Sequence, residues 1–252
     1  MPNYSIIPVK VGSKKGNKYI LMYPPEVEEV DMSNIIFLIK GGDEIVVVDT
    51  GCADSEWSKR TQHAVFEREA DEVPERALAK NQVRPEDVKI VINTHLHWDH
   101  CFNNKLFPNA TIFVQESELR YAVAPLPIHS HGYCCYKKEE YGGPPWIETF
   151  NQILPVKGDL EILPGISLIL LPGHTPGGQG VVVETARGPY VMVGDFCPLF
   201  ENWEGKGRFK HIPSGIHSSL EDYYNSFDKL DRLKAFVLPG HDAQVFKKQS
   251  YP

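Results

Sequence analysis

The hexapeptide His95-Leu96-His97-Trp98-Asp99-His100 matches the pattern HxHxDH. It follows the mostly apolar, β-branched run 88–92, which is typical of a buried strand, so we expect the hexapeptide on the loop that leaves this strand. Neutral imidazoles and an ionised carboxylate suit zinc, iron, cobalt or manganese, whereas an all-thiolate structural site needs grouped cysteines. A single His-x-His pair is more often an ordinary surface loop. Four candidate ligands within six positions instead predict a metal site, with further ligands downstream.

Three polar residues later in the chain also follow predicted strands. His174 comes after 166–171, and Asp195 and His241 come after two further apolar runs. Strand ends gather at one edge of a sheet, so these residues can converge there. Seven ligands are too many for one tetrahedral zinc ion, which favours two ions with a bridging aspartate. The candidate ligands are His95, His97, Asp99, His100, His174, Asp195 and His241.

Each downstream candidate has an ordinary structural alternative. Taken alone, His174 and His241 stand beside glycine and proline and would more often be turn residues. Asp195 could cap the segment that follows it. The whole set after strand ends is what favours metal binding.

The remaining chain predicts strands alternating with helices in one domain over residues 1–252. The expected strands are 4–11, 35–39, 44–48, 88–92, 111–114, 160–163, 166–171, 181–183, 190–193 and 236–238, and the helix-compatible segments are 55–81, 115–122 and 219–233. The strands 45–48 and 190–193 both lead to an aspartate, as in a duplicated half with two sheets face to face and helices outside. Residues 125–145 have no clear period and are expected to form a lid-like insertion.

Composition indicates a globular protein with small-molecule partners. The chain has 252 residues, 42% of them hydrophobic, and a formal net charge of −7, which argues against nucleic-acid binding. We find neither a membrane span nor a signal-type start, so we expect no membrane association and a cytoplasmic location. The five cysteines have no regular spacing, which predicts reduced thiols rather than a disulfide framework.

Four short motifs of this chain resemble the metal-binding motifs of the metallo-β-lactamase superfamily. They are HxHxDH at 95–100, Gly-His-Thr-Pro-Gly at 173–177, Gly-Asp at 194–195 and Gly-His at 240–241. From about residue 35 to residue 241 the chain is similar to the N-acyl homoserine lactonase branch. The resemblance implies an α/β (α+β) fold, namely a four-layer αββα sandwich. The resemblance also implies a homodimer.

The resemblance assigns a role to each candidate ligand. It implies that His95, His97 and His174 bind the first metal, that Asp99, His100 and His241 bind the second, and that Asp195 bridges them. Asp49 would orient ligands from outside the metal sphere, although a hydrogen bond within its own turn explains it nearly as well. Zinc is the expected metal, with iron, cobalt and manganese as alternatives.

The implied activity is the opening of a lactone ring by a metal-bridging hydroxide. Asp195 and Asp99 are the expected catalytic residues, with Asp195 passing the proton to the departing alkoxide. The alternatives are a glyoxalase II-like thioester hydrolase, another ester hydrolase, or a non-hydrolytic diiron redox module. In β-lactamases a cysteine ligand replaces the bridging aspartate, so Asp195 argues against antibiotic hydrolysis.

The chain departs from the lactonase branch where a tyrosine follows the bridging aspartate, because here Phe196-Cys197-Pro198 stands instead. This change puts homoserine lactones in doubt. Tyr223, or a tyrosine of the 125–145 insertion, could substitute. The residues predicted to line the substrate pocket are Trp98, Phe102, Tyr23, Tyr133 and Tyr136. The remaining histidines, His63, His129, His131, His211 and His217, are interpreted as surface or lid residues.

Overall fold

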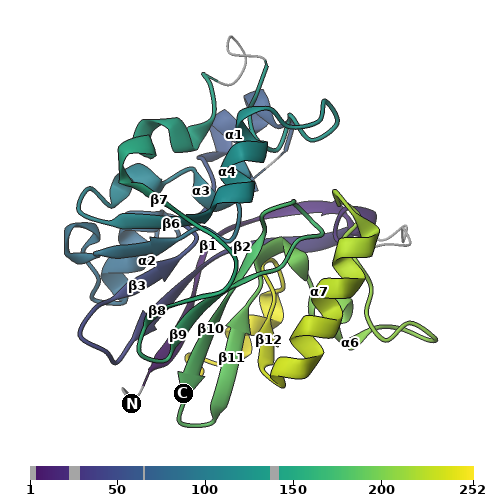
Figure 1. Cartoon of the computed structure of the whole chain (residues 1–252). Helices are drawn as coiled ribbons and strands as arrows, with labels where there is room; N and C mark the ends of the chain where they lie inside the picture. Colours follow the sequence, from purple (N-terminus) through teal and green to yellow (C-terminus); the bar gives the residue numbers. More distant parts are fainter. Residues whose placement is uncertain (1–3, 23–28, 65, 137–141) are drawn as a thin grey trace.

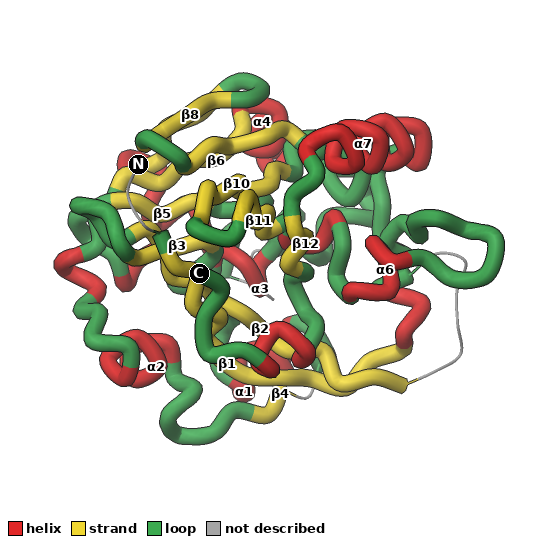
Figure 2. The backbone as a smooth tube through the Cα atoms, turned by 90° about the horizontal axis from the view of Figure 1, so that it is seen from below, coloured by secondary structure: helices red, strands yellow, loops and turns green. Residues whose placement is uncertain are grey.

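The structure is a computed structural model that describes residues 4–22, 29–64, 66–136 and 142–252. Two β-sheets lie face to face, and helices cover both outer surfaces (Figure 1). The predicted α/β fold with an αββα sandwich is therefore confirmed. The tube in Figure 2 shows α7 on the outside of one sheet and α2 on the outside of the other.

The first sheet has seven strands in the order β4-β1-β2-β3-β5-β6-β7. Its strands are β1 (Ser5–Asn17), β2 (Glu29–Lys40), β3 (Val46–Val48), β4 (Phe66–Glu67), β5 (Ile90–Ile92), β6 (Thr111–Gln115) and β7 (Ile153–Val156). β1 and β2 form a long antiparallel ribbon, whereas β3, β5, β6 and β7 run parallel. The parallel strands direct their carboxyl ends to the same edge.

The second sheet has five strands in the order β12-β11-β10-β9-β8. They are β8 (Leu160–Leu163), β9 (Ile166–Leu170), β10 (Gln179–Thr185), β11 (Gly188–Met192) and β12 (Phe236–Leu238). β11 and β12 are parallel and the other pairs are antiparallel. The main core between the sheets includes Phe37, Val48, Leu168, Val181 and Met192. Burial of these side chains holds the two sheets together.

In the described part of the chain, six α-helices accompany the two sheets. They are α1 (Ser55–Thr61), α2 (Pro74–Lys80), α3 (Trp98–Cys101), α4 (Glu116–Val123), α6 (Phe200–Glu204) and α7 (Leu220–Leu233). The short 3-10 helices are Lys18–Ile20, Pro85–Asp87, Asn104–Leu106, Pro145–Gln152, Gly194–Phe196 and Ala243–Lys247. In α7, Tyr223, Phe227 and Leu230 recur at helical spacing and pack on the second sheet.

Several predicted boundaries differ from the structure; β2, for example, begins at Glu29 instead of residue 35. β1 continues to Asn17 instead of ending at residue 11, because a bulge between Lys10 and Ser13 lets it keep pairing with β2. The helix-compatible segment 55–81 divides into α1, β4 and α2, and α2 begins at Pro74 as expected. β7 was not predicted; it lies at the edge of the sheet, where Pro155 is tolerated within a strand.

The predictions about cysteines and membrane spans can also be compared with the structure. All five cysteines are free and buried. Within the described ranges, no helix is both long and apolar enough to cross a membrane.

Candidate metal centre

The structure brings all seven candidate ligands together at the ends of strands from both sheets. The hexapeptide follows β5, while His174, Asp195 and His241 follow β9, β11 and β12. Potential ligand atoms form two groups, within each of which the atoms lie within 4.8 Å of one another. The first group is His95, His97, His174 and Asp195, and the second is Asp99, His100 and His241.

In the first group, three imidazole nitrogens converge. His97 Nδ1 lies 3.0 Å from His95 Nε2 and 3.1 Å from His174 Nε2. Burial lowers the pKa of all three side chains, because the interior solvates the charged imidazolium poorly. The three rings are therefore neutral near pH 7 and can direct lone pairs at a common point, as a metal ion requires.

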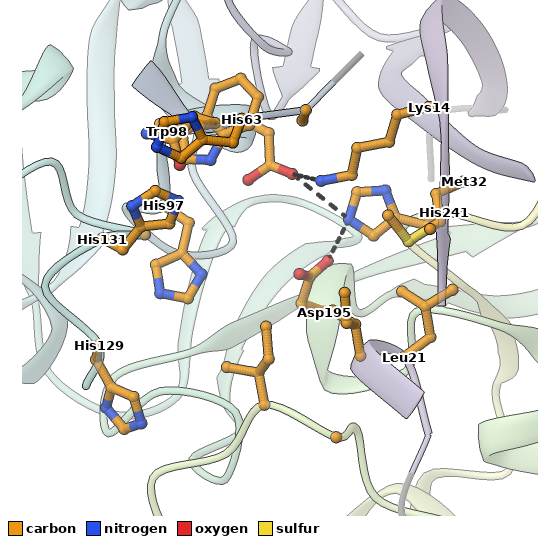
Figure 3. Close-up of a pocket in the computed structure, with 18 of the residues that line it drawn as sticks. Lys14, Leu21, Met32, His63, His97, Trp98, His129, His131, Asp195 and His241 are labelled. Atoms are coloured by element: carbon orange, nitrogen blue, oxygen red, sulfur yellow. Dashed lines mark ion pairs between the residues drawn. The ribbon is translucent and has the colours of Figure 1, made fainter. Parts of the chain in front are cut away.

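Asp195 lies between the two groups. Its Oδ1 is 2.8 Å from His241 Nε2 and 3.1 Å from His100 Nε2, and its Oδ2 is 3.6 Å from His174 Nε2. Figure 3 shows Asp195 and His241 pointing toward each other beside the cavity. Burial alone would raise the pKa of Asp195, but His241 and His100 outweigh burial and hold this pKa well below its ordinary value. The carboxylate is therefore ionised and offers one oxygen to each group.

Buried polar atoms without hydrogen bonds test whether metal ions fit here. Among the described side chains, His100 Nε2 and Asp195 Oδ1 are both buried and make no hydrogen bond of acceptable geometry. Such orphaned atoms are rare in folded proteins and mark a site for an additional group. Imidazoles and carboxylates in these two groups are a donor set for two divalent ions that share Asp195. The residues fit the predicted pair of ions.

Asp49 supports both groups from behind. It accepts a hydrogen bond from His100 Nδ1 at 2.8 Å, and it also accepts bonds from the Thr94 backbone N–H at 2.7 Å and the Thr94 hydroxyl at 2.8 Å. The Thr94 hydroxyl lies 3.1 Å from His95 Nδ1, which can donate to it. The outer nitrogens of His95 and His100 are thus occupied, and their Nε2 atoms face the centre.

The other histidines are oriented by backbone contacts. His174 Nδ1 donates to the Ile216 carbonyl at 2.9 Å and His241 Nδ1 donates to the Ser33 carbonyl at 2.7 Å. His97 uses the opposite nitrogen, with Nδ1 directed inward, and its ring packs against Gly132. A Cβ atom at Gly132 would lie 2.8 Å from His97 Cδ2, so the insertion touches this ligand directly.

A cavity of about 630 Å³ opens beside the centre. Trp98 lines this cavity. His63, His129, His131 and His217 line it too, although they were interpreted from the sequence as surface or lid residues. Ile128 to Gly132 of the insertion also contribute to the wall.

Three of the other predicted pocket aromatics, Phe102, Tyr133 and Tyr136, lie elsewhere. Phe102 packs against Trp57 with ring centroids 4.8 Å apart, and it is not part of the described cavity wall. Tyr133 is fully buried behind His97 and donates to Glu118 at 2.8 Å, while Tyr136 is 66% exposed. Their places follow from long-range packing that their local sequence does not encode. Tyr23 lies outside the described residues.

Tyr223 is also unavailable as a substitute for the missing tyrosine. It is buried, stacks on Phe196 with centroids 4.7 Å apart, and donates to the Asp195 carbonyl at 3.1 Å. The described cavity wall contains no tyrosine.

Two residues of the site were missed by sequence reasoning. Glu118 of α4 is completely buried and accepts the Leu96 N–H at 3.0 Å, which ties the metal loop to α4. Lys14 of β1 reaches to 3.6 Å from Asp99. Neither residue has a local motif; a lone acidic residue in a helix and a lysine in a strand are ordinary surface features.

The sequence was compared with known protein families and proteins. The sequence matches the family described as the metallo-beta-lactamase superfamily over residues 29–241. An N-acyl homoserine lactonase of Bacillus sp. is 28% identical over 226 residues, which cover 86% of this chain and 84% of that protein.

Solved structures show the same fold. An N-acyl homoserine lactone hydrolase, solved with the product N-hexanoyl-L-homoserine at its catalytic metal center, has a TM-score of 0.75 at 22% identity, covering 98% of this chain and 96% of that one. AidC, a dizinc quorum-quenching lactonase, has a TM-score of 0.69 at 18% identity, covering 96% and 89%. The family match runs from the start of β2 to the last candidate ligand, and the motifs, the two facing sheets and the convergence of ligands agree with it, so the chain belongs to the metallo-beta-lactamase superfamily.

Proposed function

We propose that this protein is a metal-dependent hydrolase that opens a lactone ring. The observation that carries the proposal is the position of Asp195, whose two oxygens face separate groups of histidines at the wall of a cavity. His95, His97 and His174 would hold one divalent ion, Asp99, His100 and His241 the other, and Asp195 both. When bound, the two ions would lower the pKa of a water molecule and polarise the substrate carbonyl.

The chain's own residues would position the substrate and move the proton. In ring opening, the water oxygen bonds to the carbonyl carbon and the bond from this carbon to the ring oxygen breaks. Asp195 would take the proton from water and return it to the ring oxygen, and Asp99 would act as a ligand of the second ion. The product is a hydroxy acid.

The cavity wall suits an organic substrate. Trp98, Met32, Leu21 and Ile216 provide an apolar surface for an acyl chain or ring. We propose that residues 125–145 form a lid, because Ile128 and Gly132 lie at the wall beside His97.

We propose zinc as the metal, since AidC is a dizinc relative by structure, and iron, cobalt or manganese would bind the same ligand types. Five buried, free thiols are consistent with a cytoplasmic location. The homodimer remains a prediction from the family resemblance.

A substrate panel tests the proposed function. The zinc-loaded protein is assayed for acid release from acyl homoserine lactones, simple γ- and δ-lactones, thioesters and phosphotriesters. We expect turnover of at least one lactone class, and Asp195→Asn should abolish it while circular dichroism stays unchanged. If a thioester is hydrolysed and no lactone is, the protein is a thioester hydrolase and not a lactonase.

A further inference from the structure

Lys14 is placed in the cavity by the β1–β2 ribbon, where it pairs with Met32. Its side chain is 19% exposed, and Nζ lies 3.6 Å from Asp99 Oδ2 and 5.6 Å from the centroid of the Trp98 ring. Figure 3 shows the chain extended toward the metal centre, with Nζ facing the carboxylate. The ammonium group is therefore held over an aromatic face at the inner end of the cavity.

The carboxylates of the described cavity wall, Asp99 and Asp195, are both members of the ligand groups. Two lysines, Lys14 and Lys15, stand on the same wall. Lys15 lies 3.9 Å from Glu29, whereas Lys14 faces the inner end of the cavity, where its ammonium group can attract an anionic group of a ligand.

The charge at the inner end can be followed group by group. Two divalent ions would be balanced by Asp49, Asp99, Asp195 and one hydroxide, which leaves the ammonium of Lys14 uncompensated. The distance of 3.6 Å to Asp99 is longer than a direct hydrogen bond, so this pair does not saturate the lysine. One further negative charge, supplied by the substrate, would complete the balance.

We propose that Lys14 binds a carboxylate of the substrate, and that the preferred substrates are lactones or esters that carry such a carboxylate in addition to the bond that is hydrolysed. This inference rests on the proposed hydrolytic function and names its substrate class. The described cavity wall contains Lys14 and no tyrosine, and an ammonium group selects an anion rather than a neutral acyl amide.

The test compares two matched γ-lactones, 5-oxotetrahydrofuran-2-carboxylate and its neutral carboxamide. We expect the native protein to prefer the carboxylate by about tenfold in kcat/KM or more. Lys14→Met should raise KM for the carboxylate about ten- to hundredfold and change the carboxamide less than about threefold, whereas Lys14→Arg should retain the preference. Metal content, measured by elemental analysis, should stay the same in all variants.

A matched control is Lys10→Met on the same strand. Lys10 pairs with Glu72 at 2.7 Å and is not part of the described cavity wall, so kcat/KM for the carboxylate and for the carboxamide should be unchanged. Equal losses on the two lactones, or loss of metal from Lys14→Met, would show that Lys14 only supports Asp99 and would overturn the proposal. So would a native preference for the carboxamide.

A further measurement distinguishes failure of the proposed lactonase function from failure of the role proposed for Lys14. If neither lactone is hydrolysed, calorimetry still measures binding of the carboxylate to the zinc-loaded protein. Tighter binding than that of the carboxamide, lost in Lys14→Met, would support the role of Lys14 while the reaction is reassigned. Equal binding of the two compounds would contradict it.

Discussion

At the scale of single residues, Asp49 connects the two groups of ligands. Its carboxylate reaches His100 directly and His95 through the Thr94 hydroxyl, so one side chain sets the orientation of a ligand in each group. Its backbone has φ +58°, an uncommon conformation for a residue other than glycine. The hydrogen bonds to the site account for keeping an aspartate in this conformation.

Asp49→Asn should weaken metal binding. An amide can accept only through one oxygen and carries no charge to support two imidazoles, so we expect zinc affinity to fall about ten- to a hundredfold. Competition with a chromogenic chelator measures this change. Asp43→Asn, on the exposed turn before β3, is the control and should bind zinc like the native protein. If Asp49→Asn binds zinc as tightly as the native protein, Asp49 serves only the hydrogen bonding of its own turn.

Gly132→Ala should disturb His97 selectively. The added Cβ would stand 2.8 Å from Cδ2 and 2.9 Å from Nε2 of this ring, which is closer than carbon atoms pack, so the ring or the insertion must shift. We expect bound zinc to fall toward one equivalent per chain, with the Asp99 group still occupied. Elemental analysis after gel filtration measures bound zinc per chain. If two equivalents are retained, the insertion has moved to make room and His97 has kept its position.

At the scale of elements, α4 determines the position of the metal loop. Glu118 accepts the Leu96 N–H and the Tyr133 hydroxyl with the same oxygen, and the Tyr133 ring lies 4.6 Å from that of His97. Burial raises the pKa of Glu118, because a carboxylate in the interior loses its hydration. The helix, the insertion and the metal loop are thus linked through one buried side chain.

Glu118→Ala should loosen this link. It leaves the Leu96 N–H and the Tyr133 hydroxyl without their acceptor, and we expect about 1–3 kcal/mol less free energy of unfolding together with weaker zinc binding. Glu118→Gln keeps an acceptor oxygen and should behave closer to the native protein. Urea unfolding and zinc titration of both variants measure the two effects. Identical behaviour of the alanine and glutamine variants would contradict the role of the acceptor.

A change at the start of α7 should affect stability alone. The Ser219 side chain accepts the N–H of Asp222 at 3.1 Å and caps this helix. Ser219→Ala should therefore lower the free energy of unfolding by about 1 kcal/mol, whereas Ser219→Asn should retain most of the stability. Zinc content should be the same in both. Loss of zinc in Ser219→Ala would indicate that α7 is coupled to the centre more tightly than its packing implies.

At the scale of the whole molecule, the metal centre joins the two sheets. The hexapeptide and Asp49 follow strands of the first sheet, and His174, Asp195 and His241 follow strands of the second. Without ions, acid and imidazole groups of the two sides compensate one another, as His100 with Asp195 and Asp99 with His241. Ions held by both sheets stabilise the folded state because the unfolded chain has no preformed site.

Removal of metal should consequently lower the melting temperature. Dialysis against a strong chelator is expected to reduce Tm by several degrees or more, and zinc at a hundred times its dissociation constant should restore about 2.7 kcal/mol per site. Differential scanning calorimetry before and after restoration measures the change. An unchanged Tm would mean that the two sheets hold together without contribution from the centre.

The sequence alone determined the centre because ligand identity and strand ends are local properties. HxHxDH after an apolar run, and single His or Asp residues after later runs, specify both the donor atoms and the sheet edge where parallel strands place them. The family motifs then predicted the order of sheets and helices. Helix 55–81 was predicted less well, since its short break at β4 depends on pairing with β1.

Only the tertiary structure decided what surrounds the centre. Lys14 enters the cavity because the β1–β2 ribbon extends past its bulge, and Tyr133 is buried because Glu118 and His97 meet it from distant parts of the chain. Nothing in the residues next to Phe102 indicates that it packs against Trp57 rather than in the pocket. The chemistry of the ligands is therefore encoded locally, whereas the pocket's shape and charge arise from long-range packing, which local residue patterns do not specify.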